Sequence, residues 1–261
     1  MTSNMAADPV LHIEGMSIVY DSTQGPLTAL SKLDLEIGKG EFVAVLGPSG
    51  CGKSTLLRVI SGLLPISAGA ARISGEAIKG PRKDVGIVFQ QPTLLPWRTV
   101  RENVLVPIRA QRLPVKQYEA EADRLLNLVG LGKFASHLPR ELSGGMQQRA
   151  GIARGLIHDP AVLLMDEPFA ALDALTRERM TDELQSIWMA TQKTVLFITH
   201  SIPEAVYLAD KVVVLSGRPG TKVLELPIPL ERPRTLKTMA SPEFGALANQ
   251  LREMFSSLVA D

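Results

Sequence analysis

Five short apolar runs along the chain hardly alternate with polar residues. Such runs are typical of strands in a parallel sheet that is covered on both faces, because neither side of the strand then meets water. Stretches with helical spacing separate most of them. We therefore expect an α/β fold built on a buried parallel sheet, in which the last four runs are central strands. The five runs are residues 42–46, 85–89, 162–165, 194–198 and 212–215.

Two further regions have different patterns. Residues 10–13, 17–20 and 33–37 are short strand-like pieces, and residues 33–37 alternate apolar with acidic side chains as a half-buried strand does. These pieces predict an antiparallel β portion near the N-terminus. Residues 91–159 are mostly helical in character, and the apolar positions of residues 115–129 are spaced three and four apart, so we expect a helical insertion here.

The tail from residue 218 to residue 261 contains prolines that exclude a long helix until residue 241. Ser241, Pro242 and Glu243 then supply an N-cap, a first-turn proline and an early acidic residue, so a final helix is expected. Its apolar residues share one face, which we expect to pack on the same domain, with a contact to a second subunit or a regulator as the alternative. They are Phe244, Leu247, Leu251, Phe255 and Leu258.

The composition is that of one globular domain over residues 1–261. The formal net charge is +1, from 28 basic and 27 acidic residues, so we expect no nucleic-acid partner. The single cysteine allows no intramolecular disulfide. Residues 1–9 lack the features of a secretion signal, and no apolar run approaches the ~18 residues that span a bilayer. Any membrane role is therefore expected to come through a partner.

A glycine-rich loop lies between the apolar run 42–46 and a helical stretch at residues 56–60. Its glycines allow successive N–H groups to turn inward and form an anion site at the start of the helix. Lys53 is expected to reach the β- and γ-phosphates of ATP, and the Ser54 hydroxyl to bind Mg²⁺. The alternative is a glycine-rich turn without a ligand. The loop consists of Gly47, Pro48, Ser49, Gly50, Cys51, Gly52, Lys53, Ser54 and Thr55.

Two carboxylates, Asp166 and Glu167, end the apolar run that begins at residue 162. The ends of strands are where an open α/β sheet presents ligand groups. We expect Asp166 to hold Mg²⁺ through water, and Glu167 to polarise the water that attacks the γ-phosphate. Without the glycine-rich loop at residues 47–55, called the phosphate loop from here on, the pair would be interpreted as a solvated turn.

Ser143, Gly144 and Gly145 lie directly before a helical stretch at residues 146–157, which predicts a second anion-binding helix start. Residues 142–149 resemble the signature motif of ATP-binding cassette (ABC) ATPases, and the resemblance covers nearly the whole chain in order and spacing. It implies a single ABC nucleotide-binding domain with a P-loop NTPase (RecA-like) core. It also implies a head-to-tail dimer, in which the loop around Lys53 of one subunit and Ser143 to Gly145 of the other enclose each ATP.

Four more positions match this family. The resemblance implies that Gln90 senses Mg²⁺, that His200 contacts the γ-phosphate, that Asp173 carries signals between the two sites and that Tyr20 stacks on adenine. Taken alone, Gln90 is an ordinary strand-end amide, His200 a structural histidine and Tyr20 a packing residue.

Departures from the family pattern are Met146 in place of glutamine, Ala170 in place of serine and Ser201 in place of an acidic residue. These departures put in question a hydrogen bond to the ribose or between subunits. They remove none of the groups to which a chemical role is assigned. Cys51 is expected either to make the ATPase sensitive to thiol reagents or to act as a small filler.

The biological task depends on the partner. Residues 91–100 lie where the family's transporters receive the membrane subunit, and Trp97 there is either an interface anchor or a core residue under the helical insertion. Residues 94–104, 172–177 and 207–210 are similar to the nitrate, sulfonate and taurine importer subfamily. This resemblance implies import of a small, anionic solute through a permease.

The same resemblance implies a second ATP-binding subunit, a separate solute-binding protein and a location at the cytoplasmic face of the membrane. An exporter or lipid-trafficking subunit is the main alternative, and a soluble ABC ATPase is a further one. A metabolic kinase is disfavoured because it gives no reason for Ser143, Gly144 and Gly145. The solute itself is not predicted, because other subunits recognise it.

Overall fold

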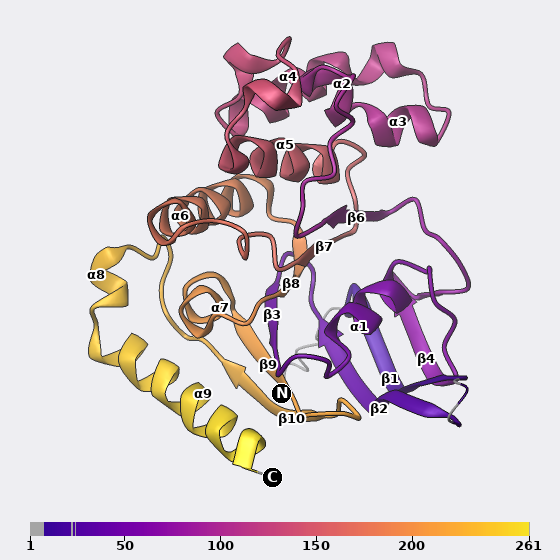
Figure 1. Cartoon of the computed structure of the whole chain (residues 1–261), viewed down its shortest axis with the longest axis vertical. Coiled ribbons are helices and arrows are strands. Elements are labelled where there is room, and N and C mark those ends of the chain that lie inside the picture. Colours follow the sequence, from indigo (N-terminus) through magenta and orange to yellow (C-terminus); the bar gives the residue numbers. More distant parts are fainter. Residues whose placement is uncertain (1–7, 22, 24, 261) are drawn as a thin grey trace, which may run out of the picture.

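The computed structural model describes residues 8–21, 23 and 25–260, and it contains two β-sheets with helices packed around them (Figure 1). The expectation that residues 1–9 lack a secretion signal falls mostly outside these residues. The predicted α/β fold with an N-terminal antiparallel portion is confirmed.

The larger sheet has six strands in the order β10-β9-β3-β8-β7-β6, and every pair except β10–β9 is parallel. The apolar run 85–89 was expected to be a central strand, but β6 lies at the edge. It is as apolar as the others because helix α5 crowds it: a methyl group built on Gly86 would lie 2.3 Å from the Gly155 carbonyl oxygen. The strands are β3 (Phe42–Leu46), β6 (Val85–Val88), β7 (Val162–Asp166), β8 (Thr194–Ile198), β9 (Lys211–Leu215) and β10 (Lys222–Pro227).

The smaller sheet is antiparallel, with the order β2-β1-β4-β5. The two predicted pieces at 10–13 and 17–20 form one strand, because an irregularity between Ile13 and Ile18 keeps the chain in the sheet. Gly15 takes a positive φ of 52° there, and its N–H donates to Asp34 Oδ1 at 2.6 Å. The strands are β1 (Leu11–Tyr20), β2 (Leu27–Ile37), β4 (Ala68–Ile73) and β5 (Glu76–Ala77).

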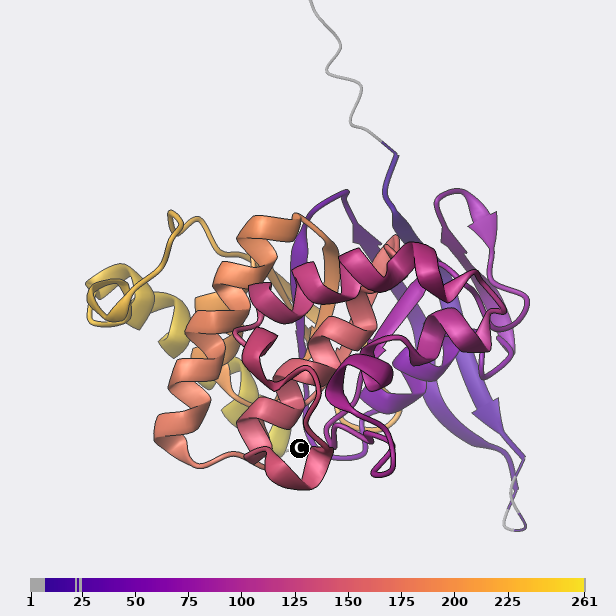
Figure 2. The ribbon, with the colours of Figure 1, turned by 90° about the horizontal axis from the view of Figure 1, so that it is seen from above.

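Between residues 91 and 159 every regular element is helical. Figure 1 shows this helical portion above the sheets, and both Figure 1 and Figure 2 show the antiparallel sheet and the C-terminal helices α8 and α9 on opposite sides of the molecule. The predicted helix at 115–129 begins as a 3₁₀ turn. The elements are α2 (Val100–Val104), α3 (Val106–Ala110), η1 (Val115–Tyr118), α4 (Glu119–Leu128), η2 (Gly132–Phe134), η3 (Pro139–Glu141) and α5 (Gly144–Leu156).

The C-terminal third supplies α6 (Ala174–Thr191), α7 (Ile202–Leu208), α8 (Leu236–Met239) and α9 (Pro242–Ala260). The Ser241 hydroxyl accepts from the Phe244 N–H at 3.2 Å, as expected for an N-cap. Phe244 and Leu251 are buried in the main core, and Leu247, Phe255 and Leu258 pack against it, so the predicted packing of this helix on its own domain is confirmed.

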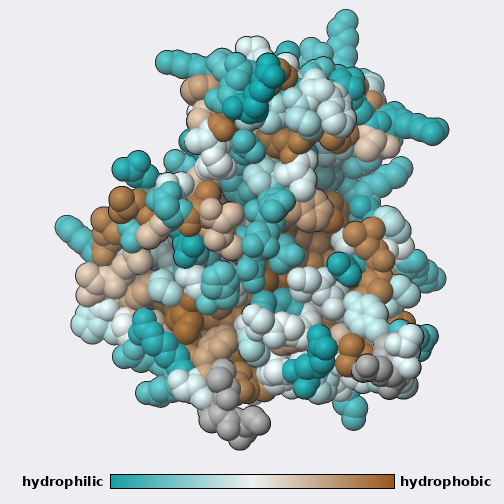
Figure 3. Space-filling model, in the orientation of Figure 1, coloured by the Kyte–Doolittle hydropathy of each residue, from teal (hydrophilic) through white to brown (hydrophobic). Residues whose placement is uncertain are grey.

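The surface is of mixed polarity. On the face shown in Figure 3, polar and intermediate residues predominate, and apolar residues lie among them in separate groups. Among the described residues, no helix is both long and apolar enough to cross a bilayer.

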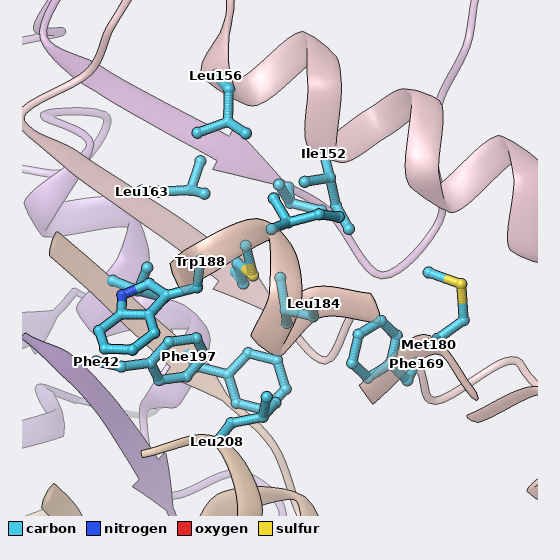
Figure 4. Packing of buried hydrophobic residues seen from close by; sticks show 14 of the residues in the cluster. Phe42, Ile152, Leu156, Leu163, Phe169, Met180, Leu184, Trp188, Phe197 and Leu208 are labelled. Carbon is cyan, nitrogen blue, oxygen red and sulfur yellow. The ribbon is translucent and has the colours of Figure 1, made fainter. Parts of the chain in front are cut away.

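Alternate side chains of the same strand enter two different cores. Phe42, together with every second residue of β3, packs under α5, α6 and α7, whereas Val43 and Val45 pack against α1 (Lys53–Ile60) and the antiparallel sheet. In the first core, Phe42 meets Trp188 edge-on at a centroid distance of 5.9 Å and Phe197 at 5.6 Å (Figure 4). Coverage of both faces explains why the strands carry uninterrupted apolar runs.

Candidate active site

The phosphate loop joins β3 to α1, as predicted. Gly50 and Gly52 have φ values of 78° and 101°, a region that favours glycine. Space also requires Gly52, because a methyl group there would lie 2.7 Å from Leu30 and 2.9 Å from the Ala29 carbonyl oxygen. Lys53 is buried and folds back over the loop, where Nζ donates to the Gly47 carbonyl at 2.7 Å and to the Pro48 carbonyl at 2.9 Å. The loop is therefore a compact cradle with a cation at its centre.

A pocket of about 300 Å³ opens over this cradle. Tyr20 belongs to its wall, and its hydroxyl oxygen lies 3.2 Å from Thr55 Oγ1, at the start of α1. The end of β1 and the phosphate loop are thus brought together although they lie far apart in the sequence. The pocket is lined by Tyr20, Leu27, Ala29, Ser49, Gly50, Gly52, Lys53, Ser54, Thr55, Glu167 and Arg218.

Cys51 faces the interior of the protein. Its side chain is fully buried, and a methyl group on Gly47 would lie 2.6 Å from Cys51 Sγ. Burial raises the pKa of the thiol, while the nearby Lys53 opposes the shift. The side chain therefore fills space beneath the loop, and of the two expectations for Cys51 the structure favours the filler.

The carboxyl ends of β7 and β8 bring Glu167 and His200 together. Glu167 Oε2 lies 3.1 Å from His200 Nδ1. The His200 tautomer with its hydrogen on Nδ1 makes this contact a hydrogen bond to the carboxylate. Glu167 takes a φ of 41°, unusual for a residue with a side chain, and its N–H donates to the Ile198 carbonyl at 2.9 Å. The backbone thus holds this carboxylate in a strained but fixed position.

Asp166 occupies the last position of β7, beside Glu167. Burial raises the pKa of the Asp166 carboxyl, the charge of Glu167 raises it further, and Lys53 and Arg58 oppose the shift. A divalent cation would relieve the first two effects. Asp166, Ser54 and Gln90 together offer carboxylate, hydroxyl and amide oxygens, which is the donor chemistry that Mg²⁺ prefers. The side chains present therefore fit that ion.

Gln90 follows β6 and is exposed. Val88 of β6 pairs in register with Met165 of β7, so Gln90 and Asp166 lie at the same end of the sheet. The helix α5 is bonded to this segment: Gln148 donates to the Phe89 carbonyl at 3.1 Å, and Arg154 donates to the Pro92 carbonyl at 2.6 Å. A shift of α5 would therefore be transmitted to the residues on both sides of Gln90.

Ser143 and Asp173 lie away from the pocket. The Ser143 hydroxyl caps α5 by accepting from the Met146 N–H at 3.4 Å, and Asp173 Oδ1 caps α6 by accepting from the Thr176 N–H at 3.0 Å. The two helix starts meet, since a methyl group on Gly145 would lie 3.3 Å from Thr176. Ser143, Gly144 and Asp173 are exposed, and none of them lines the pocket. The structure therefore separates the predicted site residues into two groups.

Two polar connections near the site were not expected from the sequence. The Thr199 hydroxyl donates to Glu204 Oε2 at 2.6 Å, and Arg177 approaches Glu204 at 3.8 Å while donating to the Leu172 carbonyl at 3.0 Å. This chain of contacts links the segment before Asp173 to the segment that carries His200. Ser201, which stands where the family has an acidic residue, also has a structural role. Its hydroxyl caps α7 by accepting from the Glu204 N–H.

Arg218 is a charged pocket residue that sequence reasoning missed, as it missed Leu27 and Ala29. It lies in the turn between β9 and β10, which the sequence marks only by glycine and proline. Its Nε lies 3.4 Å from the Gly50 carbonyl oxygen. Only the folded chain brings this turn to the phosphate loop.

The comparisons with known proteins agree with this geometry. Residues 30–170 match the ABC transporter family. The chain is 44% identical to a taurine import ATP-binding protein of Rhizobium johnstonii, over 95% of this chain and 97% of that protein. It is 45% identical to a nitrate import ATP-binding protein of Synechocystis, over 94% of each.

A solved structure is also similar. It is a dimeric ATP-binding cassette in a post-hydrolysis state with ADP and Pi, which matches with a TM-score of 0.72 and 31% identity over 85% of this chain and all of that one. The family match and this structure agree with the two-sheet α/β architecture. The chain therefore belongs to the ABC transporter family and is one of its ATP-hydrolysing, ATP-binding cassettes.

Proposed function

We propose that this chain energises the import of a small, anionic solute of the nitrate, sulfonate or taurine type through a membrane permease. The observation that carries the proposal is the identity of 44–45% to taurine and nitrate import ATP-binding proteins over 94% or more of the chain. The chain would work at the cytoplasmic face of the membrane, held there by the permease, and a separate solute-binding protein would deliver the solute.

In this proposal the pocket binds ATP, and the side chains that follow β7 and β8 hydrolyse it. Tyr20 stacks on the adenine, and the backbone N–H groups of the loop, together with Lys53, hold the phosphates. Ser54, Gln90 and Asp166 would hold Mg²⁺, which would supply positive charge that stabilises the phosphates. Glu167 accepts a proton from the attacking water or orients that water, and His200, held by Glu167, contacts the γ-phosphate.

We further propose that two copies of the chain form the working unit, head to tail. Ser143, Gly144 and Asp173 are exposed and lie outside the pocket of their own chain, which fits a role in completing the pocket of a second copy. The N-terminus of α5 offers free N–H groups and a positive dipole end to such a phosphate. Binding of ATP would then draw the copies together, and hydrolysis would release them.

The permease would dock at residues 91–100. Trp97 is 71% exposed, which excludes the alternative of a core tryptophan. An exposed tryptophan is a frequent anchor of protein interfaces. The neighbouring segment is bonded through Arg154 to α5, which begins at Ser143 and Gly144, so docking at Trp97 and closure around ATP would be mechanically connected.

The test is co-purification of the tagged chain from membranes of its native host, with wild type, Trp97→Ala and Leu236→Ala compared. Leu236 is 73% exposed but lies on α8, which Figure 1 shows apart from the helical portion that contains α2, and it serves as the matched control. We expect a multi-span permease with wild type and Leu236→Ala, and recovery lowered about tenfold or more with Trp97→Ala. Recovery of only soluble or nucleic-acid-binding partners with wild type would overturn the importer proposal.

The solute class has its own test. The chain, its permease and the solute-binding protein are reconstituted in vesicles containing ATP, and uptake is measured with taurine, other sulfonates and nitrate. We expect ATP-dependent uptake of at least one of these anions. Export of a substrate from the side that carries the cassette would contradict the direction of transport.

A further inference from the structure

Arg218 presents a guanidinium group at the edge of the nucleotide pocket. It lines the pocket together with Tyr20 and Lys53, and its side chain is exposed. Its contact with the phosphate loop is loose: Nε lies 3.4 Å from the Gly50 carbonyl oxygen, and a methyl group on Gly50 would lie 3.7 Å from Nη2. A hydrogen bond of that length contributes little, so the side chain is close to the loop without being bound tightly to it.

The backbone that carries Arg218 is, by contrast, held firmly. The Gly220 N–H donates to the Ala29 carbonyl at 2.9 Å, and the Gly220 carbonyl accepts from the Ser31 N–H at 3.0 Å. Gly220 also lies so close to the phosphate loop that a methyl group there would be 2.0 Å from the Cys51 carbonyl oxygen. The Ser216 hydroxyl donates to the Pro219 carbonyl at 3.0 Å. The turn is therefore clamped between β2 and the phosphate loop.

The charge of Arg218 has no counter-ion in the part of the chain that the structure describes. Arg232 differs, because it pairs at 2.8 Å with Asp210, at the other end of β9. Among the described residues that line the pocket, Glu167 is the one carboxylate, and it is engaged by His200. In this part of the structure, two cations, Lys53 and Arg218, thus face the pocket beside an acid that already has a partner, which is the charge balance that suits a polyanion.

We propose that Arg218 is a second phosphate-binding cation of this ATP site, acting on the nucleotide bound to its own chain. The inference rests on the proposed nucleotide pocket around Lys53 and Tyr20. A guanidinium forms planar, paired hydrogen bonds to phosphate oxygens, and its long side chain reaches them from a fixed backbone. Sequence motifs do not reveal this residue, because it comes from the turn between β9 and β10.

The experiment measures equilibrium binding of ATP, ADP and AMP to the purified chain with Mg²⁺, at protein concentrations low enough to keep it monomeric. Arg218→Ala is compared with Arg218→Lys and with Arg252→Ala. Arg252 is an exposed arginine of α9 that donates to Asn249 and does not line the pocket, and it controls for the loss of one positive charge. Thermal unfolding of each variant checks that the fold is intact.

We expect Arg218→Ala to bind ATP and ADP about tenfold or more weakly, since it loses a charge-assisted hydrogen bond, and AMP with a smaller change. Arg218→Lys should recover part of the affinity, and Arg252→Ala should match wild type. Affinities within about twofold of wild type for Arg218→Ala would overturn the inference. Normal affinity with impaired ATP-dependent dimerisation would also overturn it, and would assign Arg218 to the contact between subunits.

Measuring Lys53→Ala in the same assay distinguishes a failure of the inference about Arg218 from a failure of the proposed nucleotide pocket. If Lys53→Ala binds ATP weakly and Arg218→Ala binds it normally, only the inference about Arg218 fails. If both variants bind ATP as wild type does, the phosphate loop itself is wrongly assigned, and the proposed pocket fails with it.

Discussion

Two regions of this molecule carry the family's phosphate-binding motifs, and they differ in how complete they are. Around Lys53, one chain builds a pocket, with walls from β1, β2, the phosphate loop, Glu167 and the turn at Arg218. Around Ser143, the same chain builds an exposed helix start, which the Ser143 hydroxyl caps and which lies beside the start of α6. The first region has the features of a binding site by itself, whereas the second has a function only if something else approaches it. This difference is the basis for proposing that the pocket of a second copy of the chain approaches the helix start around Ser143.

The largest expected effect concerns the carboxylate that closes the first region. Glu167→Gln keeps the size and the hydrogen-bonding reach of the side chain but removes its basicity, so we expect ATP turnover to fall by about a hundredfold or more, while ATP affinity stays near that of wild type. Turnover by phosphate release and affinity by equilibrium titration check this. A variant with near-normal turnover would remove Glu167 from the chemistry and leave the first region as a binding site only.

A smaller effect is expected at the cation of the cradle. Lys53→Ala removes the buried ammonium that bonds to the Gly47 and Pro48 carbonyls, and with it the main positive charge at the phosphates. We expect ATP affinity to fall by about 10- to 100-fold, which corresponds to the loss of a hydrogen bond to a charged group. Isothermal titration with ATP measures it, with the exposed Lys237→Ala on α8 as the control. Unchanged affinity would contradict the assignment of the loop.

The smallest effect concerns the rigidity of the first region. Cys51 lies fully buried beneath the loop, and burial raises its thiol pKa, so less of the reactive thiolate is present at a given pH than for an exposed cysteine. We expect the native protein to react with a maleimide about tenfold or more slowly than the same chain in denaturant. The labelling rate followed by mass spectrometry tests this. Equal rates would mean that the phosphate loop opens readily in the native protein. The region around Lys53 could then no longer be described as the preformed one of the two.

Much of the fold could be predicted from the sequence. The apolar runs predict the strands because both faces of the sheet are covered, by α1 and the antiparallel sheet on one side and by α5, α6 and α7 on the other. The position of β6 at the edge was missed for the same physical reason, since α5 buries it as thoroughly as a central strand. The continuity of β1 was missed because a glycine with positive φ interrupts the alternation without ending the strand.

The candidate site divides in the same way. Local spacing predicts the phosphate loop, because a strand, glycines and a helix must follow one another along the chain. Arg218 and Glu204 have no such local pattern. Arg218 reaches the pocket through bonds between Gly220 and Ala29, and Glu204 meets Arg177 only when α6 and α7 pack together. Residues that depend on contacts between distant segments are invisible to motif spacing.

The central claim is that the second region of one chain completes the first region of another, and mixing two inactive variants tests it most directly. Lys53→Ala damages the first region. Gly144→Asp damages the second, where the exposed N-terminus of α5 has room for a side chain and tolerates an acid, but the new charge would repel a phosphate. Each variant alone should lack ATPase activity, and Gly144→Asp should still bind ATP.

In a head-to-tail dimer of the two variants, both lesions fall in the same site and the other site is intact. An equal mixture should therefore regain up to about a quarter of the wild-type activity, since half of the dimers are mixed and each has one intact site. Two affinity tags confirm that mixed dimers form. Recovery of activity is the predicted result, whereas mixed dimers without activity, or full activity of Gly144→Asp alone, would contradict the account.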